Sequence, residues 1–371
     1  MIGDHSIPKR RWGLLCLLAV VLLCGIALLA LPAANAYALI QTEGSYRATP
    51  PIPQAFTTPT PTPLASALPM PITTGGCCAH PFWSLDSDWV LFLDQRGSTH
   101  AGLYAVPSSG GEALLVHDRV GTYSSDLALI AYLENGQTIV ERWVDGVRWI
   151  IPNQGREVFF SPSGESICWS MISSGVTFPN LRQRAIWVAA NDGSDAREVV
   201  TVTGGEFLGW AEDEDAILVS GRLAPDLPAG IWRIELETGA GLLLYEIEVP
   251  LRALVSPGGE QIAFIQAFEE SGRNGLWVAC ADGGGSQRLD VFGAFRWLDD
   301  HHLAVIPMDL NADSPSLWRV TLGGESERWV GLGSSGQRIL NNDWSISPDA
   351  SRLVFRSARD DSLWVITLPE P

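Results

Sequence analysis

Lysine is almost absent from this sequence. The chain has 371 residues, and Lys9 is its only lysine. Residues 76–371 therefore offer no lysine for a Schiff base, a phosphate-gripping loop or a Ser–Lys pair. No G-x-x-x-x-G-K-S/T motif occurs, and no G-x-G-x-x-G motif precedes a helical pattern. These absences exclude the common nucleotide-binding loops, so we expect no nucleotide cofactor.

Positive charge of any kind is scarce. The chain carries 24 Lys and Arg against 42 Asp and Glu, for a net charge of −18. Residues 76–371 alone hold 20 Arg against 40 acidic residues, for a net charge of −20. A surface this acidic repels phosphate backbones and anionic lipids, so we expect no nucleic acid partner. The chain also has only six histidines and no G-x-S-x-G motif, which leaves few residues for hydrolase or lyase chemistry.

The six cysteines fall into groups with different expected roles. Cys168 and Cys280 lie in apolar runs and are expected to be buried small hydrophobic residues. Cys77 and Cys78 are adjacent, and in an oxidising compartment they are candidates for a disulfide with each other or with another partner. With His80 they form C-C-x-H, a spacing that does not fit the usual zinc patterns.

The N-terminus carries an apolar run of 18 residues, 14–31, after a short basic segment, 1–13. Positive charge before an apolar run places that end in the cytoplasm. The run fits either an uncleaved transmembrane anchor or the core of a signal peptide that is cleaved after Ala36. Both alternatives place the rest of the chain outside the cytoplasm, in a single-pass membrane protein or a secreted one.

Residues 37–75 are predicted to be a linker. Their second half alternates Thr and Pro with almost no charge. Such a composition cannot form a hydrophobic core and adopts an extended, semi-rigid conformation. The linker would present residues 76–371 away from the membrane.

A repeat organises residues 76–371. Its last copy is SPDASRLVF at residues 347–355, followed by LWVITL at 363–368. In each copy, an apolar residue precedes a turn position, and an apolar run ends eight residues after that position. The seven turn positions are 84, 124, 161, 211, 256, 298 and 347. A period near 44 residues with four short apolar runs predicts an all-β, seven-bladed β-propeller, with six or eight blades as alternatives.

The last repeat lacks a fourth strand, because only five residues follow residue 366. An unpaired sheet edge is a liability. We therefore predict that residues 68–77 supply the missing strand and close the ring. Deleting these residues should lower the melting temperature sharply, whereas deleting residues 50–60 should not.

The repeats resemble those of the TolB-like β-propeller family. SPDASRLVF followed by LWVITL carries the resemblance, which extends from about Ala79 to the C-terminus. The resemblance implies a propeller fold in a family that includes binding scaffolds and the propeller halves of peptidases. It also implies six blades, as in TolB itself, against the seven repeats counted here.

One segment has a spacing suited to calcium. Asp309, Asn311 and Asp313 place oxygen ligands at alternate positions, as calcium loops do. The pattern departs from an EF-hand, because Ser314 replaces the glycine and Val320 replaces the bidentate glutamate. The alternative is an ordinary polar hairpin loop, and calcium is the only cofactor that the sequence suggests.

Length variation among the repeats points to a binding face. The connections between second and third strands vary, whereas the first turns scarcely do. Blade 3 has the longest connection and carries Phe178, Arg182 and Arg184, which we predict to be ligand-binding. We favour a non-catalytic binding or scaffold module of a bacterial envelope, with an envelope protein or a cell-wall ligand as partner. The alternatives are a hydrolase or lyase in the central channel, acting on a glycan or peptide, and a ligand-sensing ectodomain.

Overall fold

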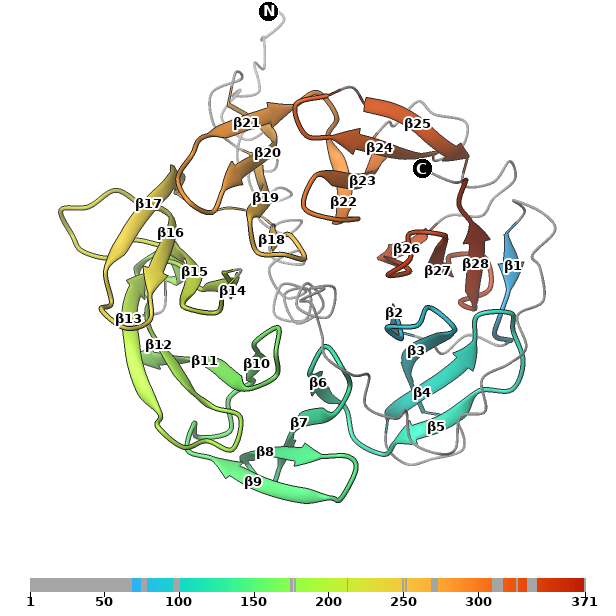
Figure 1. Cartoon of the computed structure of the whole chain (residues 1–371), viewed down its shortest axis with the longest axis horizontal. Coiled ribbons are helices and arrows are strands. Elements are labelled where there is room, and N and C mark those ends of the chain that lie inside the picture. Colours follow the sequence, from blue (N-terminus) through green and yellow to red (C-terminus); the bar gives the residue numbers. More distant parts are fainter. Residues whose placement is uncertain are drawn as a thin grey trace, which may run out of the picture.

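The computed structural model forms a ring of seven antiparallel β-sheets around a common axis (Figure 1). It describes residues 69–74, 79–95, 101–173, 176, 178–211, 213–248, 250, 252–267, 273–308, 316–324, 326–331 and 339–369. The apolar run, the linker up to residue 68, Cys77, Cys78 and the candidate calcium loop lie outside these residues. Within the described ranges, no helix is long and apolar enough to span a membrane. The prediction of an all-β, seven-bladed propeller is confirmed.

Each blade has four strands, ordered from the axis outward. Blades 1 to 3 are β2 (Ala79–Trp83), β3 (Trp89–Asp94), β4 (Gly102–Pro107) and β5 (Leu114–His117); β6 (Gly121–Tyr123), β7 (Leu129–Glu134), β8 (Gln137–Arg142) and β9 (Val147–Ile151); and β10 (Phe159–Phe160), β11 (Ser166–Ser173), β12 (Gln183–Ala190) and β13 (Arg197–Thr203). Blades 4 and 5 are β14 (Phe207–Trp210), β15 (Ala216–Gly221), β16 (Gly230–Glu235) and β17 (Gly241–Glu246); and β18 (Ala253–Val255), β19 (Gln261–Gln266), β20 (Gly275–Cys280) and β21 (Ser286–Leu289). Blade 6 is β22 (Gly293–Trp297), β23 (His302–Pro307), β24 (Ser316–Thr321) and β25 (Ser326–Gly331), and blade 7 is β26 (Ile339–Ile346), β27 (Arg352–Ser357), β28 (Leu363–Thr367) and β1 (Met70–Pro71).

The turn between the first and second strands has the same construction in several blades. Ser347 Oγ donates to Asp349 Oδ1 at 2.5 Å and accepts from the backbone N–H of Arg352 at 2.9 Å. Ser84 and Ser124 make the same pair of contacts in blades 1 and 2. A side chain that satisfies backbone donors within its own turn makes that turn compact.

The core is a series of apolar clusters between neighbouring blades, and the residue just before each turn is buried in it. These residues are Trp83, Tyr123, Phe160, Trp210, Val255, Trp297 and Ile346. Two of the indoles also form hydrogen bonds to the preceding blade. Trp297 Nε1 donates to Leu254 O at 2.8 Å, and Trp83 Nε1 donates to Ser345 O at 3.3 Å. A twisted sheet covered on both faces by its neighbours therefore needs large apolar side chains at this repeat position.

The N-terminal side of the described chain closes the ring. β1 pairs with β28, with Met70 opposite Val365 and Pro71 opposite Trp364. Ile72 is 2% exposed in the cluster between blades 7 and 1. Thr73 Oγ1 accepts the backbone N–H of Leu363 at 2.8 Å. The prediction that residues 68–77 supply the last strand is confirmed, and the propeller begins before residue 76.

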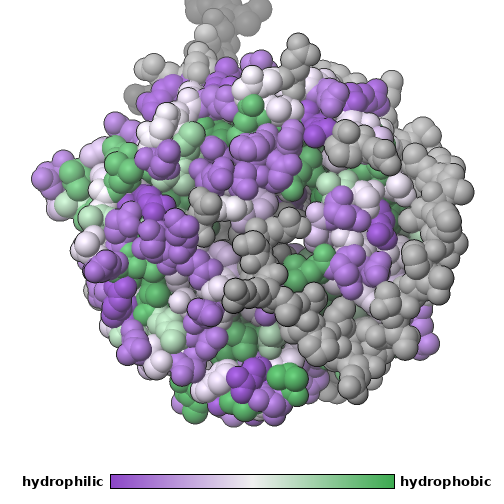
Figure 2. All heavy atoms as spheres, in the orientation of Figure 1, coloured by the Kyte–Doolittle hydropathy of each residue, from purple (hydrophilic) through white to green (hydrophobic). Residues whose placement is uncertain are grey.

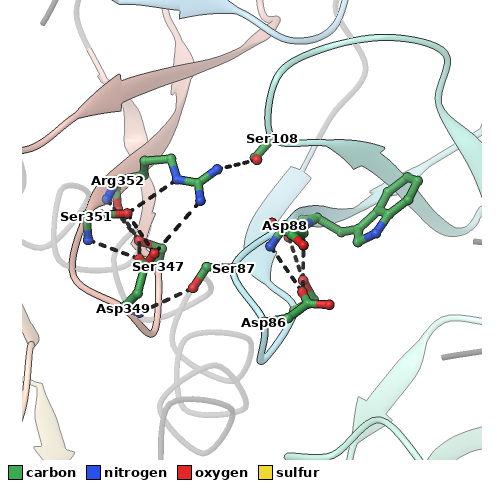
Figure 3. A network of polar contacts seen from close by, with 10 residues as sticks. Asp86, Ser87, Asp88, Ser108, Ser347, Asp349, Ser351 and Arg352 are labelled. Atoms are coloured by element: carbon green, nitrogen blue, oxygen red, sulfur yellow. Dashed lines mark hydrogen bonds and ion pairs between the residues drawn. The ribbon is translucent and has the colours of Figure 1, made fainter. Parts of the chain in front are cut away.

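Polar contacts between the turns of blades 7 and 1 reinforce this closure (Figure 3). The backbone N–H of Asp349 donates to Ser87 Oγ at 3.2 Å. Arg352 donates to Ser108 Oγ of blade 1, and its guanidinium lies 5.6 Å from the ring centroid of Trp83. The first and last blades are thus joined through their turns as well as through β1.

The charge of Asp349 should make this junction sensitive to pH. Burial tends to raise the pKa of Asp349, but hydrogen bonds from Ser347 and Ser351 and the charge of Arg352 outweigh it, so the pKa lies below its usual value. A carboxylate with a lowered folded-state pKa stabilises the protein above its unfolded-state pKa, and this contribution is lost as the pH falls through the folded value. Because the side chain is about half exposed, solvent screens its charge, and we expect Asp349→Asn to lower the free energy of unfolding by no more than about 1 kcal/mol at pH 7.

Urea denaturation between pH 2.5 and pH 7 measures this effect. The difference between wild type and Asp349→Asn should stay constant from pH 7 to about 5 and shrink below about 4. A difference that does not change with pH would show that the negative charge contributes nothing.

Candidate functional site

The two ends of the ring differ in the regularity of their connections. We call one end the loop face; it carries the connections between second and third strands and between consecutive blades. The other end, the turn face, carries the turns between first and second strands. These turns have five residues in six blades and four in blade 6, whereas the second-to-third connections range from two residues (135–136) to nine (174–182). The predicted contrast in length variation is confirmed.

Exposed apolar side chains concentrate on the loop face. Among the described residues, fourteen large apolar side chains are exposed, and nine of them lie in or next to loop-face connections. These nine are Val120, Leu133, Ile172, Val176, Phe178, Leu181, Leu227, Phe292 and Met308. Val144 and Val147 lie in or next to a turn-face connection, and the other three are on outer strands. The face of the ring seen in Figure 2 shows apolar side chains in small groups that polar side chains separate.

The connection of blade 3 presents Phe178, the more exposed of the two phenylalanines in this set. Its hairpin projects because β11 and β12 have eight residues each, against six in most of the other second and third strands. A short 3₁₀ helix, η2 (Pro179–Leu181), follows Phe178. Phe178 is 67% exposed and Leu181 is 56% exposed. Arg182 follows η2, and its backbone carbonyl accepts the N–H of Gly204 at 2.9 Å, which holds the loop against the next connection. We call Phe178, Leu181 and Arg182 the blade 3 patch.

Arg184 lies apart from this patch. Its Nη1 donates to Gly205 O at 2.9 Å and lies 3.1 Å from Glu206 Oε2. Both partners belong to the connection between blades 3 and 4. The structure therefore places Phe178 and Arg182 together on the loop, whereas Arg184 joins β12 to that connection. Ligand binding by these three residues remains a prediction.

Charged residues on or just before the innermost strands form a second candidate site, which the sequence analysis did not single out. Four of them lie four residues before the turn position of their blade: His80, Glu157, Arg252 and Asp343. Arg296 lies nearby on β22. We call these five residues the inner ring. The repeat position that four of them share is the signal in the sequence that could have revealed them.

The carboxyl groups of the inner ring have altered acidity. Burial raises the pKa of Asp343 against the opposing effects of the His80 backbone N–H and the charges of His80, Arg356 and Arg296. That N–H lies 3.1 and 3.0 Å from the two oxygens of Asp343. Burial also raises the pKa of Glu157. Carboxyl groups with raised pKa values can hold or release a proton closer to neutral pH than ordinary ones.

Other candidate sites give less support for chemistry. In the ranges that the structure describes, no three His, Cys, Asp or Glu side chains group as metal ligands. Cys168 is fully buried, as predicted, and burial raises the pKa of its thiol, whereas Cys280 is only partly buried. A groove of about 650 Å³ lies far from the axis between blades 5 and 6, where Arg288, Asp290 and Trp318 contribute to its walls.

Comparison with known proteins supports the architecture. No protein-family model and no curated protein matches the sequence. Solved structures do match. An oligogalacturonate lyase from Vibrio parahaemolyticus has a TM-score of 0.60 and 12% identity, over 81% of this chain and 94% of its own. The shared feature is the propeller fold.

Two other groups of solved structures are similar to the chain. An acylaminoacyl peptidase from Pyrococcus horikoshii has a TM-score of 0.54 and 13% identity, over 80% of this chain and 53% of its own. TolB from Acinetobacter baumannii has a TM-score of 0.43 and 14% identity, over 70% of this chain and 64% of its own. The seven blades agree with the repeat count and not with the six blades that the TolB-like resemblance implies.

Proposed function

We propose that the protein is a non-catalytic binding propeller, presented outside the cytoplasm at a bacterial cell surface, whose loop face contacts an envelope protein. The observation that carries this proposal is the clustering of nine of the fourteen exposed large apolar side chains on that face. Scattered single apolar residues are normal on protein surfaces, but a concentration on one face is typical of an interaction site.

The blade 3 patch is the proposed centre of this contact. Phe178 and Leu181 contribute nothing to the interblade core while they are exposed, and aromatic anchors with a neighbouring arginine are typical interface hot spots. Arg182 is a positive charge on a strongly acidic protein. The patch therefore suits a protein surface with an apolar pocket beside a carboxylate.

Replacing Phe178, Leu181 and Arg182 together with alanine should weaken partner binding at least tenfold. The measurement is saturable capture from a solubilised envelope, followed by titration of the identified partner. A matched control replaces Leu115, Ile150 and Arg197, which are two exposed apolar residues and an exposed arginine on outer strands. Both triple variants should melt near the wild-type temperature, because all six side chains are exposed or lie at the surface. Capture by the patch variant at the wild-type level would refute the proposal.

A second candidate function is catalysis near the axis. It is favoured by the raised pKa values of Glu157 and Asp343 on the inner ring. An oligogalacturonate lyase also shares the fold, over 99% of its own length, in a structure in complex with manganese. Turnover of oligogalacturonates by the wild type that is lost in Asp343→Asn would replace the proposed function with this one. No turnover, with or without manganese, would leave the binding propeller as the better account.

A further inference from the structure

The groove of about 650 Å³ lies on the outer side of the ring, between β21 of blade 5 and β24 of blade 6 (Figure 1). Its lining extends from Gly323 and Gly324, in the turn between β24 and β25, to Asp290 and Val291, which follow β21 toward the loop face. Small-ligand sites typically have volumes of about 300–1,000 Å³. The groove is therefore large enough for a small ligand, and it follows the direction of the strands.

The groove is open because β21 is short. This strand has four residues, against five to seven in β9, β13, β17 and β25, so it covers less of the next blade. Trp318 and Val320 are two residues apart on β24 and face the same side of the sheet. Val320 is 2% exposed in the cluster between blades 5 and 6, whereas Trp318 is only half-buried and lines the groove. In blade 4, which the seven residues of β13 cover, the equivalent Trp232 is 5% exposed.

The indole of Trp318 is oriented but not stacked. Its Nε1 donates to Ser316 Oγ at 3.0 Å, and no aromatic ring among the described residues contacts it. Trp187, at the equivalent position of blade 3, instead stacks on Trp169 with a distance of 6.2 Å between the ring centroids. An indole that is held by a hydrogen bond and has no aromatic neighbour can serve as a stacking platform for a ligand.

Polar side chains with free hydrogen-bonding groups line the same groove. Arg288 Nε donates to Asn274 O at 2.9 Å, which leaves both Nη groups without an acceptor among the described residues. Asp290 has no hydrogen bond or ion pair within those residues, and Thr321 and Ser326 add two hydroxyl groups. The charges of Arg288 and Asp290 cancel. A neutral groove with both donors and acceptors suits an uncharged ligand that is rich in hydroxyl groups.

We propose that this groove binds a neutral oligosaccharide, with one pyranose ring against Trp318 and its hydroxyl groups hydrogen-bonded to Arg288 and Asp290. The face of an indole is electron-rich, so it attracts the C–H bonds on the apolar side of a pyranose ring. A guanidinium and a carboxylate supply strong donors and acceptors for the hydroxyl groups. An anionic saccharide is disfavoured, because the protein as a whole is strongly acidic. The groove shares no residue with the blade 3 patch, so oligosaccharide binding and capture of an envelope protein succeed or fail separately.

Calorimetric titration of the full chain tests this site with cellotetraose, N-acetylated chitotetraose and tetragalacturonate. At least one of the neutral tetrasaccharides should give a saturable isotherm and raise the melting temperature. Tetragalacturonate should bind about tenfold or more weakly than that neutral ligand, because like charges repel. Trp318→Ala should weaken binding of the neutral ligand about tenfold or more, because the stacking platform is lost.

Two further variants separate a binding role of Trp318 from a structural one. Trp187→Ala removes a half-buried indole from the equivalent strand of blade 3 and should leave oligosaccharide binding unchanged. Ser326 lies opposite Val320 on β25 and lines the groove. Ser326→Trp should therefore fill the groove and abolish binding while Trp318 stays in place, and it decides the question if Trp318→Ala does not fold.

Three results would overturn the proposal. The first is the absence of saturable binding by both neutral tetrasaccharides, and the second is wild-type affinity in Ser326→Trp. The third is tighter binding of tetragalacturonate than of either neutral ligand. A tetraalanine peptide is titrated in parallel, and its saturable binding without that of the oligosaccharides would assign the groove to a protein segment instead.

Discussion

Replacing Ile72 with alanine should lower the free energy of unfolding by about 2–5 kcal/mol. Ile72 follows the two-residue strand β1 and is 2% exposed in the cluster that joins blades 7 and 1, together with Trp83 and Val365. Its loss leaves a cavity at the boundary between blades 7 and 1, where the two ends of the described propeller meet. The effect should therefore be large for a residue beside so short a strand.

Thr74 provides the matched control, because it is exposed two residues further along. Thr74→Ala should change stability by about 0.5 kcal/mol or less. Urea denaturation of the three proteins measures the difference. Equal stability of Ile72→Ala and Thr74→Ala would mean that the closing segment does not hold the ring together.

Replacing Trp297 with alanine should lower the free energy of unfolding by about 3–5 kcal/mol. The indole is 4% exposed between blades 5 and 6, and its Nε1 donates to Leu254 O across that boundary. Alanine removes both the apolar packing and the hydrogen bond, and it leaves the carbonyl of Leu254 without this donor.

Phenylalanine substitutions separate the two contributions. Trp210 occupies the equivalent position of blade 4, but its Nε1 is buried without an acceptor among the described residues. Trp297→Phe loses a hydrogen bond that Trp210→Phe does not, so it should be more destabilising by about 1 kcal/mol. Equal losses in the two variants would show that the bond to Leu254 adds nothing to packing.

The sequence allowed much of the fold to be predicted, because a propeller repeats local rules. The turn at residues 347–351 could be recognised from Ser347 and Asp349 alone, since both act within their own turn. The burial of Trp83 and Trp297 followed from their shared position before such turns. The closing strand followed from a missing partner for β28, which is a hydrogen-bonding requirement of any sheet.

Contacts between blades were harder to predict. Arg184 has partners in the connection that follows β13, and no local pattern in the sequence indicates that pairing. The inner ring also depends on blades that lie side by side, so Arg252, Arg296 and Asp343 meet across about ninety residues of sequence.

Four blades contain a register shift at the aromatic residue of the third strand, which periodicity alone does not show. These shifts precede Tyr104, Trp187, Trp232 and Trp318.

The pairing of β1 with β28 also sets the order of events while the chain is made. The bond between Thr73 and Leu363 spans 290 residues. At ribosomal rates of about 5–20 residues per second, β1 waits roughly 15–60 seconds for its partner strand to be synthesised. Ile72 cannot pack against blade 7 during this interval. Blades 1 to 6 can form while the ring is still open. Nascent chains of this protein therefore cannot close the ring until the final strand emerges, although Ile72 can already pack against Trp83 and Tyr104 of blade 1.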